Sequence, residues 1–156
     1  MTTVITHNRR RSRLSAIIDQ PGGISTVMAL RQARENLNPL EGQSMELVAE
    51  AIQKLSELAP PQTIDEVEGA LLSAYRLSTD IIDSVGPFGR EDLCLAATNL
   101  CNLLDGSAID QMFDWRIITV HAQSFRLLLN LSEESTEARQ QILESLKDVL
   151  HAKLGG

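Results

Sequence analysis

The sequence has few aromatic residues and no long apolar run. Aromatic side chains make up 3% of the 156 residues, whereas the strands of β-sandwiches and barrels are typically rich in them. Uninterrupted apolar runs span only a few residues, while a membrane-spanning helix needs about 20. We therefore expect neither an aromatic-rich β-protein nor a membrane partner. With 43% hydrophobic residues, the chain can still bury a core and is not typical of disorder.

Cysteine is also scarce, since only Cys94 and Cys101 occur. Seven residues of helix would separate them by about 10 Å, which is too far for a disulfide. No histidine or further cysteine completes a metal-ligand spacing around them. An apolar signal-peptide core is absent from the first residues, which disfavours secretion. We expect two small core residues, a cytoplasmic location, and no metal or other cofactor.

Catalytic motifs of high specificity are missing as well. The turn at 86–89 lacks the glycine spacing of a phosphate-binding loop. Acidic residues between 65 and 83 fall outside the apolar stripe, where burial would be needed to separate the pKa values of an acid–base pair. These absences predict a protein that is not an enzyme.

Positive charge is concentrated in one short stretch. Residues 1–13 contain Arg9, Arg10, Arg11 and Arg13 and no acid, a net charge of +4. The other 143 residues carry 10 basic and 21 acidic side chains, a net charge of −11, which argues against nucleic acid as a partner. The basic stretch is either a solvated chain end or an arm that docks on an acidic surface. We take Arg9, Arg10 and Arg11 as candidate partner-binding residues.

Helical periodicity runs through almost the whole chain, and strand patterns are essentially absent. Proline and glycine interrupt the apolar spacing and separate the helices. The spacing predicts helices over about 10–19, 25–58, 63–85, 90–104, 110–131 and 135–154. Asn38-Pro39 predicts a kink or break, and leaves open whether residues 25–58 form one bent helix or a helical hairpin.

Adjacent prolines at Pro60 and Pro61 mark the clearest boundary, because they favour a stiff, extended connector. We therefore predict an all-α protein with two parts. Residues 1–59 form a basic arm and a helical extension, and residues 63–154 form an antiparallel four-helix bundle joined by short turns.

His121 is the one histidine inside a strong helical pattern, on the same stripe as Ile118 and Phe125. A histidine on a bundle helix invites comparison with histidine phosphotransfer domains, in which an exposed imidazole relays phosphate. Here Ser124 stands where those domains usually place lysine, and Phe125 where they place glycine. A core histidine that is hydrogen-bonded to a neighbour is the favoured interpretation, with phosphotransfer through His121 as the alternative.

Four arginines, Arg76, Arg90, Arg116 and Arg126, are scattered over three of the predicted bundle helices. They would either converge on one anionic partner or belong to a mixed, solvated surface. The second interpretation is favoured.

Three segments of the sequence resemble a known family. They are residues 21–25 (PGGIS) before a helix rich in Ala, Arg and Glu, residues 83–105 with their GPFGR turn, and residues 115–128 (WRIITVHAQSFRLL). Together they resemble CheE, small helical proteins associated with alphaproteobacterial chemotaxis clusters. The resemblance extends over about residues 9–131.

This resemblance implies a cytoplasmic accessory role in chemotaxis signalling, with no catalytic activity to carry over. Such a protein would act by binding other signalling proteins, and a chemotaxis kinase or response regulator is the expected partner. Self-association into a homodimer stays open. The candidate contact residues are Phe88, Trp115, His121 and Arg126, together with the basic arm.

Overall fold

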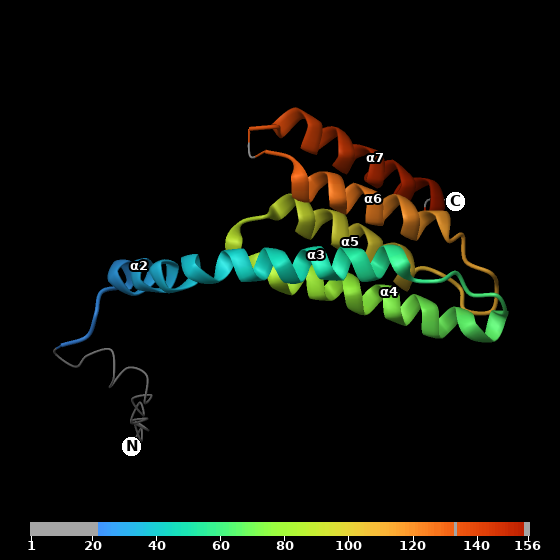
Figure 1. Cartoon of the computed structure of the whole chain (residues 1–156), viewed down its shortest axis with the longest axis horizontal. Coiled ribbons are helices and arrows are strands. Elements are labelled where there is room, and N and C mark those ends of the chain that lie inside the picture. Colours follow the sequence, from blue (N-terminus) through green and yellow to red (C-terminus); the bar gives the residue numbers. More distant parts are fainter. Residues whose placement is uncertain (1–21, 133, 155–156) are drawn as a thin grey trace, which may run out of the picture. The chain divides into compact units, whose positions relative to one another are not determined.

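The computed structural model describes residues 22–132 and 134–154, and its regular elements are all helices (Figure 1). In chain order they are α2 (Thr26–Leu37), the 3₁₀-helix η1 (Asn38–Leu40), α3 (Glu41–Glu57), α4 (Ile64–Val85), the 3₁₀-helix η2 (Gly86–Phe88), α5 (Glu91–Asp105), α6 (Arg116–Asn130) and α7 (Thr136–Leu154). No strand occurs among the described residues, so the predicted all-α class is confirmed. None of these helices has the length and apolar character needed to cross a membrane.

The chain divides into two units between Asn36 and Leu37. In the first unit, α2 starts as the sequence predicts, because the Ser25 hydroxyl accepts a hydrogen bond from the Met28 amide at 3.2 Å. No residue of α2 is buried. The predicted helix over 10–19 and the basic arm lie outside the described residues.

The predicted break at Asn38-Pro39 is confirmed. Helix α2 ends at Leu37, and Pro39 lies in the 3₁₀-turn η1 before α3 begins at Glu41. Proline has no amide hydrogen to donate and its ring clashes with the preceding turn, so the α-helical ladder cannot run through it. The backbone nevertheless stays in the right-handed helical region at Leu37, Leu40 and Glu41.

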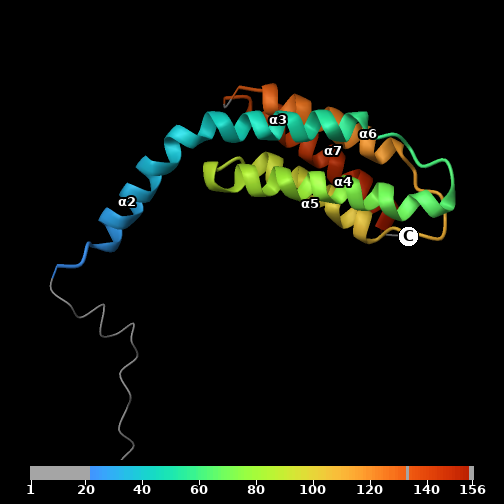
Figure 2. The ribbon, with the colours of Figure 1, turned by 60° about the horizontal axis from the view of Figure 1, so that its bottom comes forward.

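In the described part of the second unit there are five α-helices, α3 to α7, whose direction alternates from one to the next (Figures 1 and 2). Helix α4 packs on α3 and α5, α6 also packs on α3 and α5, and α7 packs chiefly on α5. All five contribute to one apolar core. Its largest fully buried apolar side chains are Val48, Ile52, Leu55, Ile81, Leu93, Leu100, Leu103, Ile118, Phe125, Leu128 and Leu146.

The structure differs from the predicted boundary at residues 59–63, because α3 belongs to the core. Val48, Ile52 and Leu55 are at most 1% exposed, and the Ser44 hydroxyl donates to the Ser84 carbonyl oxygen at 2.6 Å. The double-proline connector is short, and Pro61 itself is buried. It therefore folds α4 back along α3 instead of separating two parts, and the unit contains five helices where the sequence predicted four.

Candidate functional site

A groove between α3 and α6 brings together two of the predicted partner-binding residues, Trp115 and Arg126. We call it the α3/α6 groove, and it encloses about 390 Å³. Eleven residues of helix separate Trp115 from Arg126, or about 16 Å, so they lie well apart along α6. The lining residues are Leu55, Ser56, Leu58, Pro60, Trp115, Ile118, Thr119, Ala122, Gln123 and Arg126.

Arg126 carries the one positive charge among the lining residues, and α3 fixes its position. Its Nη2 donates to Gln53 Oε1 at 2.5 Å and to Ser56 Oγ at 2.9 Å. The Gln53 amide in turn donates to Glu57, one turn further along α3. Both acceptors of Arg126 are neutral, and among the described residues no carboxylate lies within ion-pair distance of it. The guanidinium is therefore held in place without a direct ion pair, and the Glu57 carboxylate is linked to it only through Gln53.

Trp115 precedes the first turn of α6 and is half-buried against the core. Its ring meets that of Phe113 edge to face, with the centroids 6.3 Å apart and the planes at 86°. This is a favoured geometry for an aromatic pair, and it restricts the indole. Trp115 thus provides a firm apolar surface in the groove.

His121 does not contact the groove, and the prediction that it touches a partner is wrong. The side chain is fully buried in the core, and its Nδ1 lies 2.8 Å from the Ile117 carbonyl oxygen. Because a carbonyl oxygen can only accept, Nδ1 carries the hydrogen. The favoured interpretation, a core histidine bonded to a neighbour, is therefore the correct one.

The same burial removes the basis for phosphotransfer through His121. Its Nε2 has no hydrogen-bond partner among the described residues, and the Phe125 ring lies 6.4 Å from the imidazole. Burial lowers the pKa of the imidazole, and the bond to the Ile117 carbonyl only partly offsets this. An imidazole enclosed in this way cannot meet a phosphorylated side chain of another protein.

The remaining candidates lie elsewhere. Phe88 is half-buried in η2, the short 3₁₀-helix between α4 and α5. It is not one of the residues lining the α3/α6 groove. Arg9, Arg10 and Arg11 lie outside the described residues.

The four scattered arginines do not converge. Arg126 lies in the groove, whereas Arg116 pairs with Asp114 at 2.8 Å at the start of α6. Arg76 is exposed on α4. Arg90 belongs to a separate network at the junction of α5, α6 and α7.

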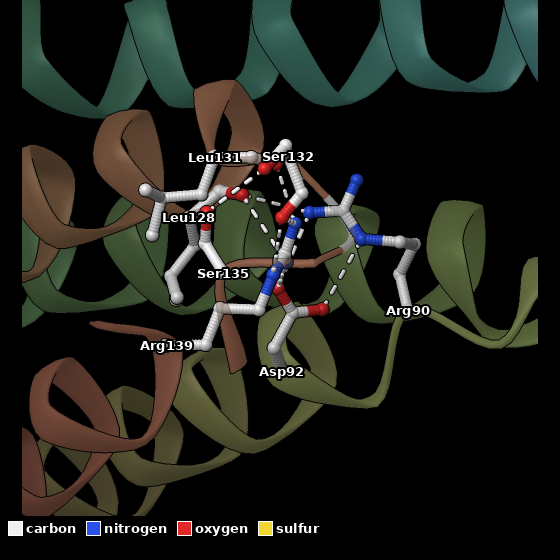
Figure 3. A network of polar contacts seen from close by, with 7 residues as sticks. All are labelled: Arg90, Asp92, Leu128, Leu131, Ser132, Ser135 and Arg139. Carbon is white, nitrogen blue, oxygen red and sulfur yellow. Dashed lines mark hydrogen bonds and ion pairs between the residues drawn. The ribbon is translucent and has the colours of Figure 1, made fainter. Parts of the chain in front are cut away.

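In that junction network, the carboxylate of Asp92 at the start of α5 accepts hydrogen bonds from two arginines (Figure 3). Arg90 donates to it through Nε and Nη2, each at 3.2 Å, and Arg139 of α7 donates through Nη1. The three side chains are 11–19% exposed. Burial raises the pKa of the Asp92 carboxyl, but the hydrogen bond and charge of Arg90, the Leu93 amide and the charge of Arg139 outweigh it, so the pKa is lowered.

The same arginines also cap the end of α6. Arg90 Nη2 donates to the Leu128 carbonyl oxygen at 2.9 Å, and Arg139 Nη2 donates to those of Leu131 at 2.5 Å and Ser132 at 3.1 Å. The last carbonyls of a helix lack intrahelical donors and attract cations. The network therefore uses its charges to join three helices.

Sequence reasoning missed Gln53 and Ser56, which orient Arg126 from α3. They are polar residues on an exposed edge of a helix, and nothing in their spacing marks them. Because the sequence placed α3 outside the bundle, its residues were not paired with those of α6.

The described residues offer little for metal or thiol chemistry. They contain no group of three or more His, Cys, Asp or Glu side chains placed to hold a metal ion. Burial and the nearby Asp92 and Glu91 raise the pKa of the Cys94 thiol, and burial and Asp105 raise that of Cys101. Both thiols are therefore protonated at neutral pH.

Comparisons with protein-family models, with curated proteins and with solved structures found no match. The functional conclusion accordingly depends on the residues and their geometry.

Proposed function

We propose that this chain is an accessory protein of chemotaxis signalling that works without catalysis, by holding a segment of a signalling protein in the α3/α6 groove. The observation that carries the proposal is the way in which Arg126 is held at the edge of the groove. Its guanidinium is oriented by two neutral acceptors, has no carboxylate within ion-pair distance among the described residues, and borders a groove lined by both apolar and polar side chains.

The chemistry of the groove defines the segment that would fit. The half-buried Leu58 and the exposed Pro60 offer apolar contacts, and the half-buried Trp115 offers a large flat surface. Arg126 can donate charge-assisted hydrogen bonds to a carboxylate. A segment that carries an aliphatic or aromatic side chain about three helical turns from an acidic residue would contact Trp115 at one end of the groove and Arg126 at the other.

The segment that resembles CheE supports the choice of partner. Residues 115–128 include helix α6 up to Leu128 and supply six of the ten residues that line the groove. A chemotaxis kinase or a response regulator is therefore the proposed partner. Residues 38–156 carry eight basic and 19 acidic side chains, so Arg126 is a local exception on an acidic unit and should dominate the recognition of an acidic segment.

Isothermal titration calorimetry of the full chain with the chemotaxis kinase and response regulators of the same organism tests the proposal. Arg126→Ala should weaken binding about tenfold or more, since a hydrogen bond to a charged group contributes about 1.5–3 kcal/mol. Arg76→Ala is the matched control, because Arg76 is exposed on α4 outside the groove, and it should leave the affinity unchanged.

Three outcomes would contradict the proposal. The first is no binding to any of these proteins. The second is equal loss of affinity in both arginine variants. The third is an acid-labile phosphate, transferred from a phosphorylated response regulator, that disappears in His121→Gln.

A further inference from the structure

Arg126 is held in the α3/α6 groove through a single nitrogen of its guanidinium. Both hydrogens of Nη2 are donated to α3, one to Gln53 Oε1 at 2.5 Å and the other to Ser56 Oγ at 2.9 Å. Of the five N–H groups of a guanidinium, the three on Nε and Nη1 have no acceptor here among the described residues. The donors of this exposed side chain are therefore divided into an occupied nitrogen and two free ones.

The occupied nitrogen decides how an anion can bind. A carboxylate pairs most strongly with two parallel N–H groups of an arginine. The guanidinium has two such pairs, Nε with Nη2 and Nη1 with Nη2, and both include Nη2. While Gln53 and Ser56 are in place, each pair lacks one of its hydrogens. A carboxylate can then form only single hydrogen bonds with Arg126, unless one of the two acceptors moves away.

Gln53 is the acceptor that can move. Its side chain is long and exposed on α3, so water can take over its hydrogen bonds when it leaves the guanidinium. Ser56 is held more firmly, because its hydroxyl also donates to the backbone carbonyl oxygen of Gln53 at 2.7 Å. Ser56 can therefore keep Arg126 in position while the Gln53 amide gives way.

Glu57 determines which end of the Gln53 amide faces Arg126. Its carboxylate accepts a hydrogen bond from the amide nitrogen, and the guanidinium can only donate. A single orientation of the amide satisfies both neighbours, with its carbonyl oxygen on Arg126. This oxygen is a planar acceptor like a carboxylate oxygen, and it takes a hydrogen that a bound carboxylate would use.

We infer that Gln53 sets the specificity of the α3/α6 groove, because its amide occupies the carboxylate position of Arg126 and only a segment with an acidic side chain displaces it. A charge-assisted hydrogen bond is about twice as strong as one between neutral groups. A segment with a neutral amide would replace one amide by another and gain little. This inference rests on the function proposed above, since it concerns what the same groove accepts.

Isothermal titration calorimetry of the full chain with the chemotaxis kinase and response regulators tests the inference. Gln53→Ala should bind the partner about threefold to tenfold more tightly than the wild type, because the amide no longer competes for Nη2. Gln53→Glu should bind it about as weakly as Arg126→Ala, since the new carboxylate would pair with Arg126. Gln43→Ala is the matched control, because Gln43 is exposed on α3 outside the groove, and it should leave the affinity unchanged.

Arginine side-chain NMR of the free chain tests the contact itself and needs no partner. The guanidinium hydrogens of Arg126 should exchange with water more slowly in the wild type than in Gln53→Ala. Those of Arg76, which is exposed on α4, should exchange equally in both and serve as the internal control.

The outcomes separate the inference from the proposed function. Equal exchange at Arg126 in the two proteins would overturn the inference alone. Unchanged or weaker partner binding by Gln53→Ala, beside a loss of binding in Arg126→Ala, would do the same and would assign Gln53 a purely orienting role. Absence of binding in every protein, the wild type included, would overturn both.

Discussion

The arginines at the junction of α5, α6 and α7 and the arginine in the α3/α6 groove differ in which groups accept their hydrogen bonds. At the junction of α5, α6 and α7, Arg90 and Arg139 share the carboxylate of Asp92 and are at most 19% exposed. In the α3/α6 groove, Arg126 is exposed and meets only an amide oxygen and a hydroxyl. A cation that is buried with a counter-ion contributes to the fold, whereas an exposed cation held by neutral groups can still bind an anion.

The strongest test of this contrast removes the shared carboxylate. Asp92→Ala should lower the free energy of unfolding by about 2–4 kcal/mol, because it leaves two largely buried arginines without a counter-ion. Urea unfolding followed by circular dichroism measures the change. Asp80→Ala is the control, since Asp80 is exposed on α4, and it should change the stability by less than about 0.5 kcal/mol.

Acidic pH should lower the free energy of unfolding of the wild type for the same reason, because it protonates Asp92. The pKa of Asp92 is lower in the folded chain than its ordinary value of 3.8, so its contribution is complete above that pH and disappears as the pH falls below it. The stabilities of wild type and Asp92→Ala should therefore converge at acidic pH. A constant difference down to strongly acidic pH would contradict the role given to Asp92.

Replacing His121 should change the free energy of unfolding by an amount that depends on pH and lies between the effects of Asp92→Ala and Arg126→Ala. Because burial lowers its folded pKa below the ordinary 6.5, the unfolded chain takes up a proton first, and stability falls as the pH drops through this value. His121→Leu should be within about 1 kcal/mol of the wild type at pH 7. Between pH 7 and 5 the free energy of unfolding of the wild type should fall by up to about 2 kcal/mol because of His121, and the His121→Leu variant should lack this decrease.

Urea unfolding at both pH values measures this effect. The wild-type loss in this range should exceed that of His121→Leu, because Asp92 responds only at lower pH. An equal pH dependence in the two proteins would mean that His121 takes up its proton in the folded chain.

Arg126 should have the smallest effect on the fold. Arg126→Ala removes hydrogen bonds from an exposed side chain, and the free energy of unfolding should change by less than about 1 kcal/mol. Thermal unfolding of this variant beside Asp92→Ala measures the difference directly. A loss as large as that of Asp92→Ala would place Arg126 among the residues that hold the fold, and the comparison between the two sites would fail.

The helices themselves were largely predictable, because local rules govern them. Ser25 caps α2, Asn38-Pro39 ends it, and the apolar residues of α4 to α7 recur at the predicted spacing. The role of α3 was not predictable, because Pro60 and Pro61 stop a helix equally well between two domains or within one. Only the packing of Ile52 and Leu55 distinguishes the two cases.

The candidate site was predictable in part. Trp115 and Arg126 were found from the sequence, but His121 was grouped with them although it lies on the buried side of the same helix. Helical spacing states which residues share a face, and it does not state whether that face meets solvent or another helix.

The sequence by itself determined that this chain is helical, where most of its helices end, and that residues 1–13 have a net charge of +4 while the rest has a net charge of −11. These properties depend on each residue and its near neighbours along the chain. The tertiary structure alone decided that α3 belongs to the core, that His121 is enclosed, and that Arg126 is held by the neutral groups of Gln53 and Ser56 without a direct ion pair. Those properties depend on contacts between residues as many as 73 positions apart, which no local pattern records.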